Sequence, residues 1–120
     1  MVYGNIADDY LCLDAPISYH PSKYTKRRLD PNGQPAITHV HVIKRFNSKT
    51  WVSLEPITGR THQLRVHLSS IQHPIIGDSL YAPHKPTSHN LCLQSYFLRF
   101  QHPLKRTYLQ FIIPPTKIWS

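Results

Sequence analysis

The stretch LEPITGRTHQLRVHLSSIQHPIIGDSLY, residues 54–81, decides how this chain folds. Leu64, Leu68 and Ile71 recur at positions i, i+4 and i+7, which predicts a helix with one apolar stripe. Pro74 cannot continue a helix, so the helix is expected to end before it. Two residues ahead of the stripe are suitable N-caps, Thr58 and Thr61.

The same segment carries a dense set of hydrogen-bonding side chains on its polar side: Arg60, His62, Gln63, Arg65 and His67. Arginine stays charged at any relevant pH and binds phosphate or carboxylate through paired hydrogen bonds. The pattern is therefore consistent with an anion-binding face. A solvated polar face on an ordinary amphipathic helix has the same composition, so the pattern alone leaves both interpretations open.

The charge of the chain is strongly basic and unevenly distributed. The formal net charge is +8, and three of the six acidic residues, Asp8, Asp9 and Asp14, precede the first basic residue, Lys23. All fourteen lysines and arginines follow, against only three further acidic residues. A basic surface attracts polyanions, of which RNA is the expected one, although a basic domain that binds no nucleic acid remains an alternative.

Residues 18–35 are expected to form a basic loop. Four cations, Lys23, Lys26, Arg27 and Arg28, alternate with two aromatic residues, Tyr19 and Tyr24, in a segment that also contains prolines. Cations of this kind contact phosphates, and the tyrosines could stack on unpaired bases. The alternative is a solvated loop whose charges only keep the chain soluble.

Alternating apolar residues predict strands on both sides of the helix. Residues 38–46 and 50–57 form a predicted hairpin, and residues 91–100 and 108–113 a second one. His39 and His41 project from one face, but no spacing typical of a metal site accompanies them. The expected fold class is α+β, a mostly antiparallel mixed sheet with one principal helix.

Length and composition bound the class of protein. A chain of 120 residues suits a single domain, and no apolar run approaches the ~18 residues of a membrane helix. Cys12 and Cys92 lie in apolar alternation, so both are expected to be buried free thiols in a reducing compartment. These features favour a cytoplasmic protein with no membrane partner.

The motif GRTHQLRVHLSSIQHPIIGDSLY, residues 59–81, resembles the signature of the RluA-type pseudouridine synthases, GRTHQLRVH followed by HPI-x-GD-x-x-Y. The stretch NGQPAIT, residues 32–38, is similar to the family's G-K-P-A-x-T. The resemblance covers nearly all of the chain, but only the C-terminal portion of the family's catalytic domain. It implies that residues 1–120 are a single domain, a partial pseudouridine synthase catalytic domain lacking the N-terminal segment with the catalytic aspartate.

The resemblance also implies which residues matter. The family isomerises uridine in RNA with an aspartate that attacks the target nucleotide, an aromatic residue against the uracil, and an arginine paired with the aspartate. Arg65 matches that arginine. Arg60, His62 and Gln63 match positions on the RNA side, where Arg60 contacts phosphate or holds the turn; His62, Gln63 and His67 are expected to pack and hydrogen-bond rather than to react.

The family's catalytic motif, H-R-L-D-x-x-T-S-G, does not occur in these residues. Arg28-Leu29-Asp30 shares three letters with it, but Pro-Asn-Gly follows, and Asp30 is better explained as part of a turn. Arg65 is therefore expected to face a carboxylate that the chain does not contain. An Arg65 side chain turned outward into water, or one already neutralised by an acidic neighbour inside a complete core, would contradict this expectation.

Two hypotheses follow from the resemblance. The chain is either the RNA-binding portion of a pseudouridine synthase, inactive until a separate chain supplies the missing N-terminal half, or a non-catalytic, vestigial RNA-binding domain. Either way the partner is RNA (rRNA or tRNA), and no metal or organic cofactor is implied. The sequence alone does not decide whether the chain is itself an enzyme. An exposed strand edge and apolar surface are expected to cause self-association.

Overall fold

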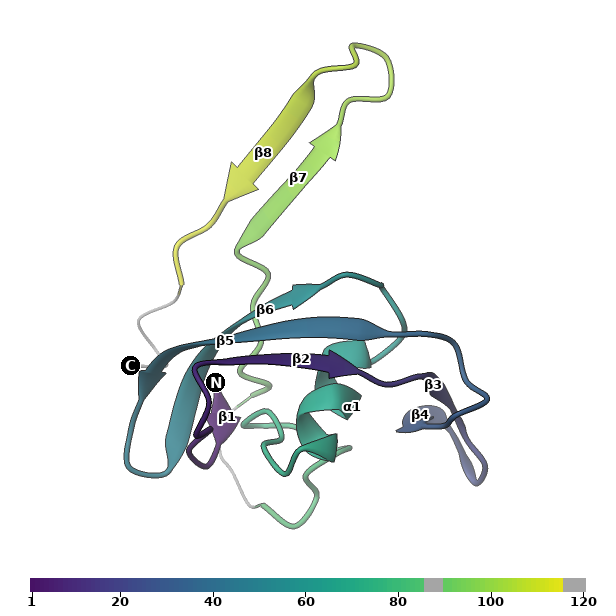
Figure 1. Ribbon diagram of the computed structural model, residues 1–120, viewed down its shortest axis with the longest axis vertical. Helices are drawn as coiled ribbons and strands as arrows, with labels where there is room; N and C mark the ends of the chain where they lie inside the picture. The colour runs from purple at the N-terminus through teal and green to yellow at the C-terminus, as the bar shows by residue number, and fades with distance from the viewer. Residues whose placement is uncertain (86–89, 116–120) are drawn as a thin grey trace.

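The computed structural model describes residues 1–85 and 90–115, except the side chains of Lys23 and Tyr24. Its centre is a four-stranded sheet in the order β1-β6-β5-β2, with one helix, α1, across one face (Figure 1). The helix is Gln63–Ser70, and the strands of this sheet are β1 (Val2–Tyr3), β2 (Tyr10–Asp14), β5 (Ile37–Arg45) and β6 (Lys49–Pro56). Among the described strands every pairing is antiparallel. The expected α+β class with one principal helix is confirmed.

The core lies between this sheet and the helix. Val40 of β5 and Leu68 of α1 have no exposed surface, and Ile75 after the helix is 1% exposed. Strand β5 alternates as predicted, since Thr38 and Val40 face the core while His39 and His41 face away. Burying such side chains contributes about 1.5–3 kcal/mol each, so the apolar stripe of the 54–81 stretch fixes the helix on the sheet.

The start of the helix differs from the prediction. The N-cap position is His62, whose backbone is left-handed at φ 56° and whose side chain makes no capping hydrogen bond. Neither Thr58 nor Thr61 caps the helix. The Thr58 hydroxyl instead donates to the Gln63 side chain at 2.7 Å and accepts the N–H of Ile37 at 3.0 Å, so it joins the helix to β5.

Residues 18–35 are not the expected loop. They contain a second sheet, the hairpin β3–β4, whose strands are Ile17–His20 and Lys23–Leu29 with an irregularity between Tyr19 and His20. The hairpin packs on the rest of the molecule through Ile17, which is 4% exposed. Most of its other residues are polar or charged, so no period-2 pattern of apolar residues marks its strands. The turn at Asp30 is confirmed, because its carboxylate accepts the Asn32 N–H and the Ser18 hydroxyl, both at 2.9 Å.

The third sheet is the hairpin β7–β8, which projects from the rest of the molecule (Figure 1). Its strands are Phe97–Gln101 and Tyr108–Ile112, so the strand expected over residues 91–100 begins only at Phe97. The radius of gyration is 15.4 Å, above the ~13.6 Å typical of a compact chain of this length.

The pairing register gives the hairpin β7–β8 one wholly apolar face. Leu98 lies opposite Phe111 and Phe100 lies opposite Leu109, and all four side chains share that face. Leu98, Phe100 and Phe111 are 54%, 41% and 53% exposed. An isolated two-stranded hairpin is marginally stable in water, and an uncovered apolar face marks a surface that packs against something else.

The two cysteines lie in different environments. Cys92 is buried as expected, but Cys12 is exposed, because it sits on the outward face of the edge strand β2. No helix in residues 1–85 and 90–115 is long and apolar enough to cross a membrane.

Candidate nucleic-acid interface

The motif residues of α1 divide into two sets, and Gln63 belongs to the inward one. Its side chain is 3% exposed and makes four hydrogen bonds. Its amide oxygen accepts from the Thr58 hydroxyl and the Arg60 N–H, while its amide nitrogen donates to the Ile37 carbonyl and the Thr38 hydroxyl. A buried amide with this many partners cannot reach RNA, so we remove Gln63 from the interface expected from the sequence.

His67 is the second inward residue and has no exposed surface. Its Nε2 lies 2.9 Å from the Ala15 carbonyl, which only accepts hydrogen bonds, so the ring proton is assigned to Nε2. Nδ1 then accepts from the Thr38 hydroxyl at 2.9 Å. The chain Gln63–Thr38–His67–Ala15 thus ties the helix to β5 and to the end of β2.

Arg65 belongs to the outward set and is paired within the chain. Its Nε and Nη2 donate to the two oxygens of Asp78 at 3.0 and 2.7 Å. The structure thus gives Arg65 a carboxylate partner within the chain, which the sequence alone did not predict. Asp78 reaches it because the turn after Pro74 folds back over the helix, and Gly77 makes that turn with φ +84°, where an added Cβ would lie 2.2 Å from the Asn90 carbonyl oxygen.

The Asp78 carboxylate is stabilised in its charged form. Burial alone pushes its pKa upward, but hydrogen bonds from Arg65 and from the N–H groups of Tyr81 and Leu80, with the guanidinium charge, hold the pKa below its usual value. The hydrogen bond to Asp78 in turn raises the pKa of Arg65. The pair is a fixed, fully ionised unit, with the Arg65 side chain 21% exposed and that of Asp78 fully buried.

Tyr81 joins this unit to the basic hairpin β3–β4. Its hydroxyl accepts the Arg27 N–H at 2.9 Å and lies 2.9 Å from Nδ1 of His62. The cations of Arg65 and Lys26 lie 5.2 and 5.5 Å from the centre of its ring, within range of cation–π attraction. Sequence reasoning assigned no role to Tyr81; the available signal was its place as the last letter of the motif.

His62 is surrounded by positive charge. It is half-buried against the Tyr81 ring, edge to face. Burial lowers its pKa, and the charges of Arg65 and Arg27 lower it further, against a smaller opposite effect of Asp78. Its imidazole is neutral near pH 7 in the absence of an anion, so an arriving phosphate would favour its protonation.

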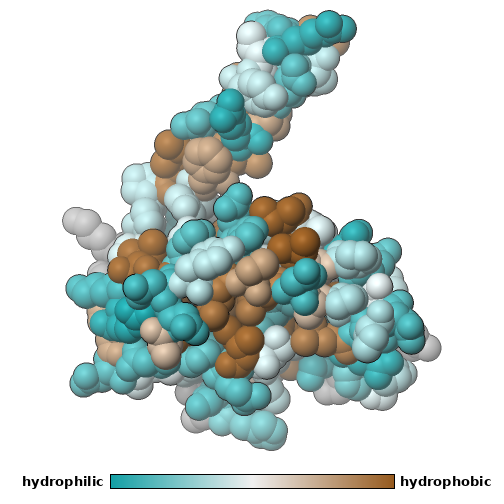
Figure 2. All heavy atoms as spheres, viewed as in Figure 1, coloured by the Kyte–Doolittle hydropathy of each residue, from teal (hydrophilic) through white to brown (hydrophobic). Residues whose placement is uncertain are grey.

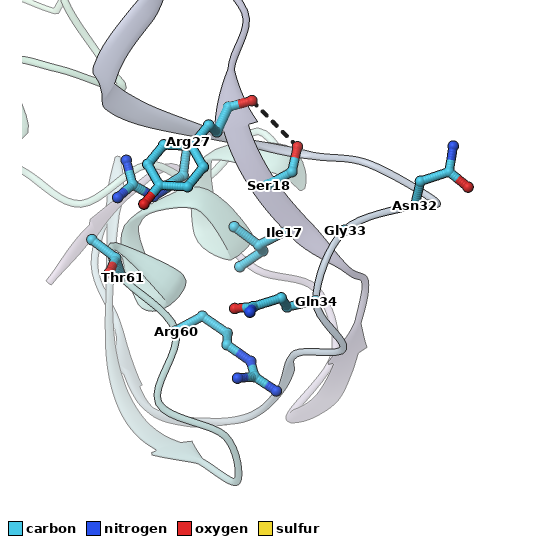
Figure 3. Close-up of a pocket in the computed structure, with 9 residues that line it drawn as sticks. Ile17, Ser18, Arg27, Asn32, Gly33, Gln34, Arg60 and Thr61 are labelled. Carbon is cyan, nitrogen blue, oxygen red and sulfur yellow. Dashed lines mark hydrogen bonds between the residues drawn. The ribbon is translucent and has the colours of Figure 1, made fainter.

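The remaining cations of the expected interface lie around the same region. Arg60 is anchored by its Nε, which donates to the Pro35 carbonyl at 2.9 Å, and it lines a pocket together with Arg27 (Figure 3). Arg28 is exposed and 3.5 Å from Asp30, and Lys26 lies over Tyr81. The Lys23 side chain lies outside the described part of the structure. In the described residues no cluster of three potential metal ligands occurs, His39 and His41 included.

A second, larger concavity lies between the sheet and the foot of the hairpin β7–β8. It has a volume of 1380 Å³ and is lined by residues of β5, β6, α1 and β7, including Trp51, Leu54, Leu64 and Phe97. Figure 2 shows apolar side chains gathered over the central sheet and the lower part of the hairpin. Leu98 belongs both to the lining of this groove and to the apolar hairpin face, so the two adjoin, and both are open in the part of the chain that the structure describes.

Comparisons with known proteins agree on one family. The profile of the family described as RNA pseudouridylate synthase matches residues 5–70. The chain is 40% identical over 114 residues to an uncharacterized RNA pseudouridine synthase, YjbO, of Bacillus subtilis, covering 95% of this chain and 40% of that protein. It is 38% identical over 119 residues to the dual-specificity RNA pseudouridine synthase RluA of Pasteurella multocida, covering 96% and 54%.

Solved structures show the same likeness. Human RNA pseudouridylate synthase domain containing 1 superimposes with a TM-score of 0.81 at 25% identity, over 94% of this chain and 51% of that one. Human RNA pseudouridylate synthase domain containing 4 gives a TM-score of 0.73, also at 25% identity, over 97% and 56%. The chain thus spans between 40% and 56% of the length of these four proteins.

Proposed function

Since this chain belongs to the RNA pseudouridylate synthase family, we propose that it is the RNA-binding portion of an RluA-type pseudouridine synthase, which isomerises uridine to pseudouridine in RNA. In this proposal residues 1–120 form one partial catalytic domain. Its substrate is rRNA or tRNA, it uses no metal or organic cofactor, and it forms no pseudouridine by itself.

The observation that carries the proposal is the docking of the basic strand β4 onto the motif helix through Tyr81. The Arg27 N–H, the His62 ring and the cations of Arg65 and Lys26 all converge on this one side chain. In the described part of the structure the acidic side chain beside Tyr81 is that of Asp78, which is buried and neutralised by Arg65. The exposed part of the cluster is therefore positive, as phosphate binding requires.

Arg65 has a second role in this proposal. Asp78 occupies the Nε–Nη2 edge of the guanidinium, and within residues 1–85 and 90–115 no hydrogen bond to Nη1 occurs. A guanidinium offers five donors in a fixed plane, so one carboxylate leaves a further edge available. We assign Asp78 the role of orienting Arg65, whose remaining edge then pairs with the nucleophilic aspartate supplied by the rest of the fold.

The partner in this proposal is the other part of the pseudouridine synthase fold, carried by a separate chain. The relatives are about twice the length of the matched segment, so each contains a comparable amount of further protein. The groove beside Trp51 and Leu54 and the apolar face of Leu98, Phe100 and Phe111 are uncovered surfaces of the kind that such a part would bury.

Two measurements test the proposal together. We expect the purified chain to bind RNA with an affinity that falls steeply with salt, and chemical mapping to show no new pseudouridine. Adding a polypeptide that carries the part of the Bacillus subtilis relative not spanned by this chain should form a complex and restore modification. A salt-independent affinity, or a new pseudouridine made by the chain alone, would refute the proposal.

A non-catalytic RNA-binding domain is the second candidate. The Arg65–Asp78 pair favours it, because the pair already gives Arg65 a structural role without any outside carboxylate. The two candidates differ in the reconstituted complex. A catalytic complex loses modification when Arg65 is replaced by lysine, whereas a non-catalytic domain gives no modification with either residue.

A further inference from the structure

The pocket beside Arg60 has the size and chemistry of a site for one nucleotide. Its volume is 330 Å³, within the range of small-ligand pockets. Four segments build it: β3 with Tyr19, β4 with Arg27, and the two turns around residues 32–34 and 60–61. Figure 3 shows Arg27 and Arg60 on opposite sides of Ile17, which forms the apolar floor between them.

Arg60 supplies directed donors to this pocket. Its Nε is held by the Pro35 carbonyl at 2.9 Å, which fixes the stem of the side chain. In the part of the chain that the structure describes, its two terminal Nη groups have no hydrogen-bond partner, and no acidic side chain lines the pocket. A fixed guanidinium with open terminal donors, in a pocket whose lining contains no carboxylate, is suited to a phosphate.

Tyr19 and Arg27 form a flat platform at the other side. The guanidinium carbon of Arg27 lies 4.0 Å from the centre of the Tyr19 ring, so one face of the ring is covered. The Tyr19 residue nevertheless remains 64% exposed. An exposed ring held by a cation is a stacking surface for an unpaired base, a contact that contributes about 1–3 kcal/mol in single-strand binding.

The part of the pocket between Arg60 and the Tyr19–Arg27 platform is tightly packed. A Cβ added to Gly33 would lie 2.6 Å from the backbone of Ile17, so the turn is packed directly on β3. Through its own N–H, Arg27 is also bonded to the Tyr81 hydroxyl. Arg27 therefore joins the pocket to the Arg65–Asp78–Tyr81 cluster and fixes the position of one relative to the other.

We propose that this pocket binds one unpaired nucleotide of the RNA substrate next to the target uridine, with its phosphate on Arg60 and its base stacked on the Tyr19–Arg27 platform. The inference rests on the proposed function and adds to it a site for a flanking nucleotide and a preference for single-stranded RNA. Paired bases are stacked within the duplex and cannot use the platform.

Binding of a fluorescent oligouridylate to the whole chain, measured by anisotropy across a salt series, tests the site. We expect Arg60→Ala to weaken binding about tenfold and to reduce the slope of log affinity against log salt by about 0.7, the value for one phosphate contact on a single strand. Arg60→Lys should restore the slope but only part of the affinity.

Tyr19→Ala should weaken binding about tenfold without changing the salt slope, and Tyr19→Phe should bind like the original chain. The matched control is Tyr108→Ala, because Tyr108 is also 64% exposed and carries Arg99 at 4.5 Å, but lies on the projecting hairpin. Lys105→Ala, at the exposed hairpin turn, controls for the loss of one positive charge. Melting temperatures of all variants confirm that they fold.

The outcomes separate this inference from the proposed function. If the original chain binds RNA with a steep salt slope but the Arg60 and Tyr19 variants match their controls, the pocket assignment is overturned and the proposed function stands. If the original chain binds no RNA, both fail. Uridine 5′-monophosphate is titrated in parallel; binding of this free nucleotide as tight as that of the oligonucleotide would assign the pocket to a small molecule and overturn the RNA site.

Discussion

Arg65 and Asp78 are joined by two hydrogen bonds of 3.0 and 2.7 Å, although they are thirteen positions apart in the chain, with a turn between them. The carboxylate is buried and also accepts two backbone N–H groups, those of Leu80 and Tyr81. One side chain therefore fixes the motif arginine, closes the turn that follows the helix, and holds Tyr81 in place.

Replacing Asp78 with asparagine is expected to lower the free energy of unfolding by about 3 kcal/mol, because it leaves a partly buried guanidinium without its counter-charge. Urea unfolding of both proteins measures the difference, with equal m-values as the check that both unfold alike. Asp9→Asn is the control, since Asp9 pairs with Arg45 at the surface and should cost under about 1 kcal/mol. An equal decrease in the free energy of unfolding of the two variants would contradict the idea that burial makes the Arg65–Asp78 pair important.

The pH dependence of stability should carry the signature of Asp78. Its pKa in the folded chain lies below the ordinary value of about 3.9, so its stabilising contribution is complete above about pH 5 and is lost as the pH falls through the folded pKa. Melting temperatures recorded from pH 5 to pH 2 should fall more steeply for the original chain than for Asp78→Asn. Parallel curves would rule this linkage out.

His62 should make RNA binding sensitive to pH. Burial and the charges of Arg65 and Arg27 lower the pKa of the free imidazole below 6.5, and a bound phosphate would raise it, so binding takes up a proton. Affinity should therefore rise as the pH falls from about 7 toward 5.5. Comparison with His62→Gln isolates the effect from the other histidines; a difference that does not change with pH would count against it.

The two glycines of the motif stretch should respond oppositely to alanine. Gly77 has φ +84° and a Cβ there would meet the Asn90 carbonyl at 2.2 Å, so Gly77→Ala should destabilise by about 2–4 kcal/mol. Gly59 has no atom within 4 Å of an added Cβ, so Gly59→Ala should be neutral or stabilising by up to about 1 kcal/mol. Thermal unfolding of both variants checks this prediction, and an equal decrease in their melting temperatures would contradict it.

The apolar hairpin face should drive self-association when the chain is studied alone. Leu98, Phe100 and Phe111 are each about half exposed on one face, and the groove beside them is apolar. Sedimentation velocity should show concentration-dependent species, and a Phe100→Glu, Phe111→Glu double variant should shift the chain toward monomer. If the original chain stays monomeric at high concentration, the apolar hairpin face does not drive self-association.

The sequence predicted those parts of the fold whose pattern follows from burial. Strand β5 alternates as predicted, with Val40 buried and His39 and His41 facing away. Of the predicted helical stripe, Leu68 is buried, Ile71 packs against the core and Leu64 is half-buried. The rest of the buried helix face is formed by Gln63, Val66 and His67. Hairpin β3–β4 was missed because its strands are mostly polar or charged and Ile17 is their buried apolar residue in the described part of the structure, so no apolar period marks them. Cys12 was assigned to the core because alternation does not show which of the two faces is buried.

The site was predicted less completely, because its hydrogen bonds join residues that are far apart in the sequence and meet only in the folded chain. Nothing in the spacing of Arg65 and Asp78 reveals that the turn at Gly77 brings them together. Likewise, the burial of Gln63 depends on Thr38 and Ile37, which lie 25 and 26 residues away. The role proposed for Arg65 and the RNA contacts of Arg60, Arg27, Lys26, Arg28 and Lys23 remain predictions.

The four hydrogen bonds of Gln63 have a consequence for how such signatures are used in genome searches. Gln63 and His67, two of the letters that make GRTHQLRVH recognisable, hold the helix on the sheet, so selection for the fold would preserve them in a descendant that had stopped modifying RNA. A match to the signature consequently diagnoses common ancestry and shape, and only an assay of the product diagnoses turnover.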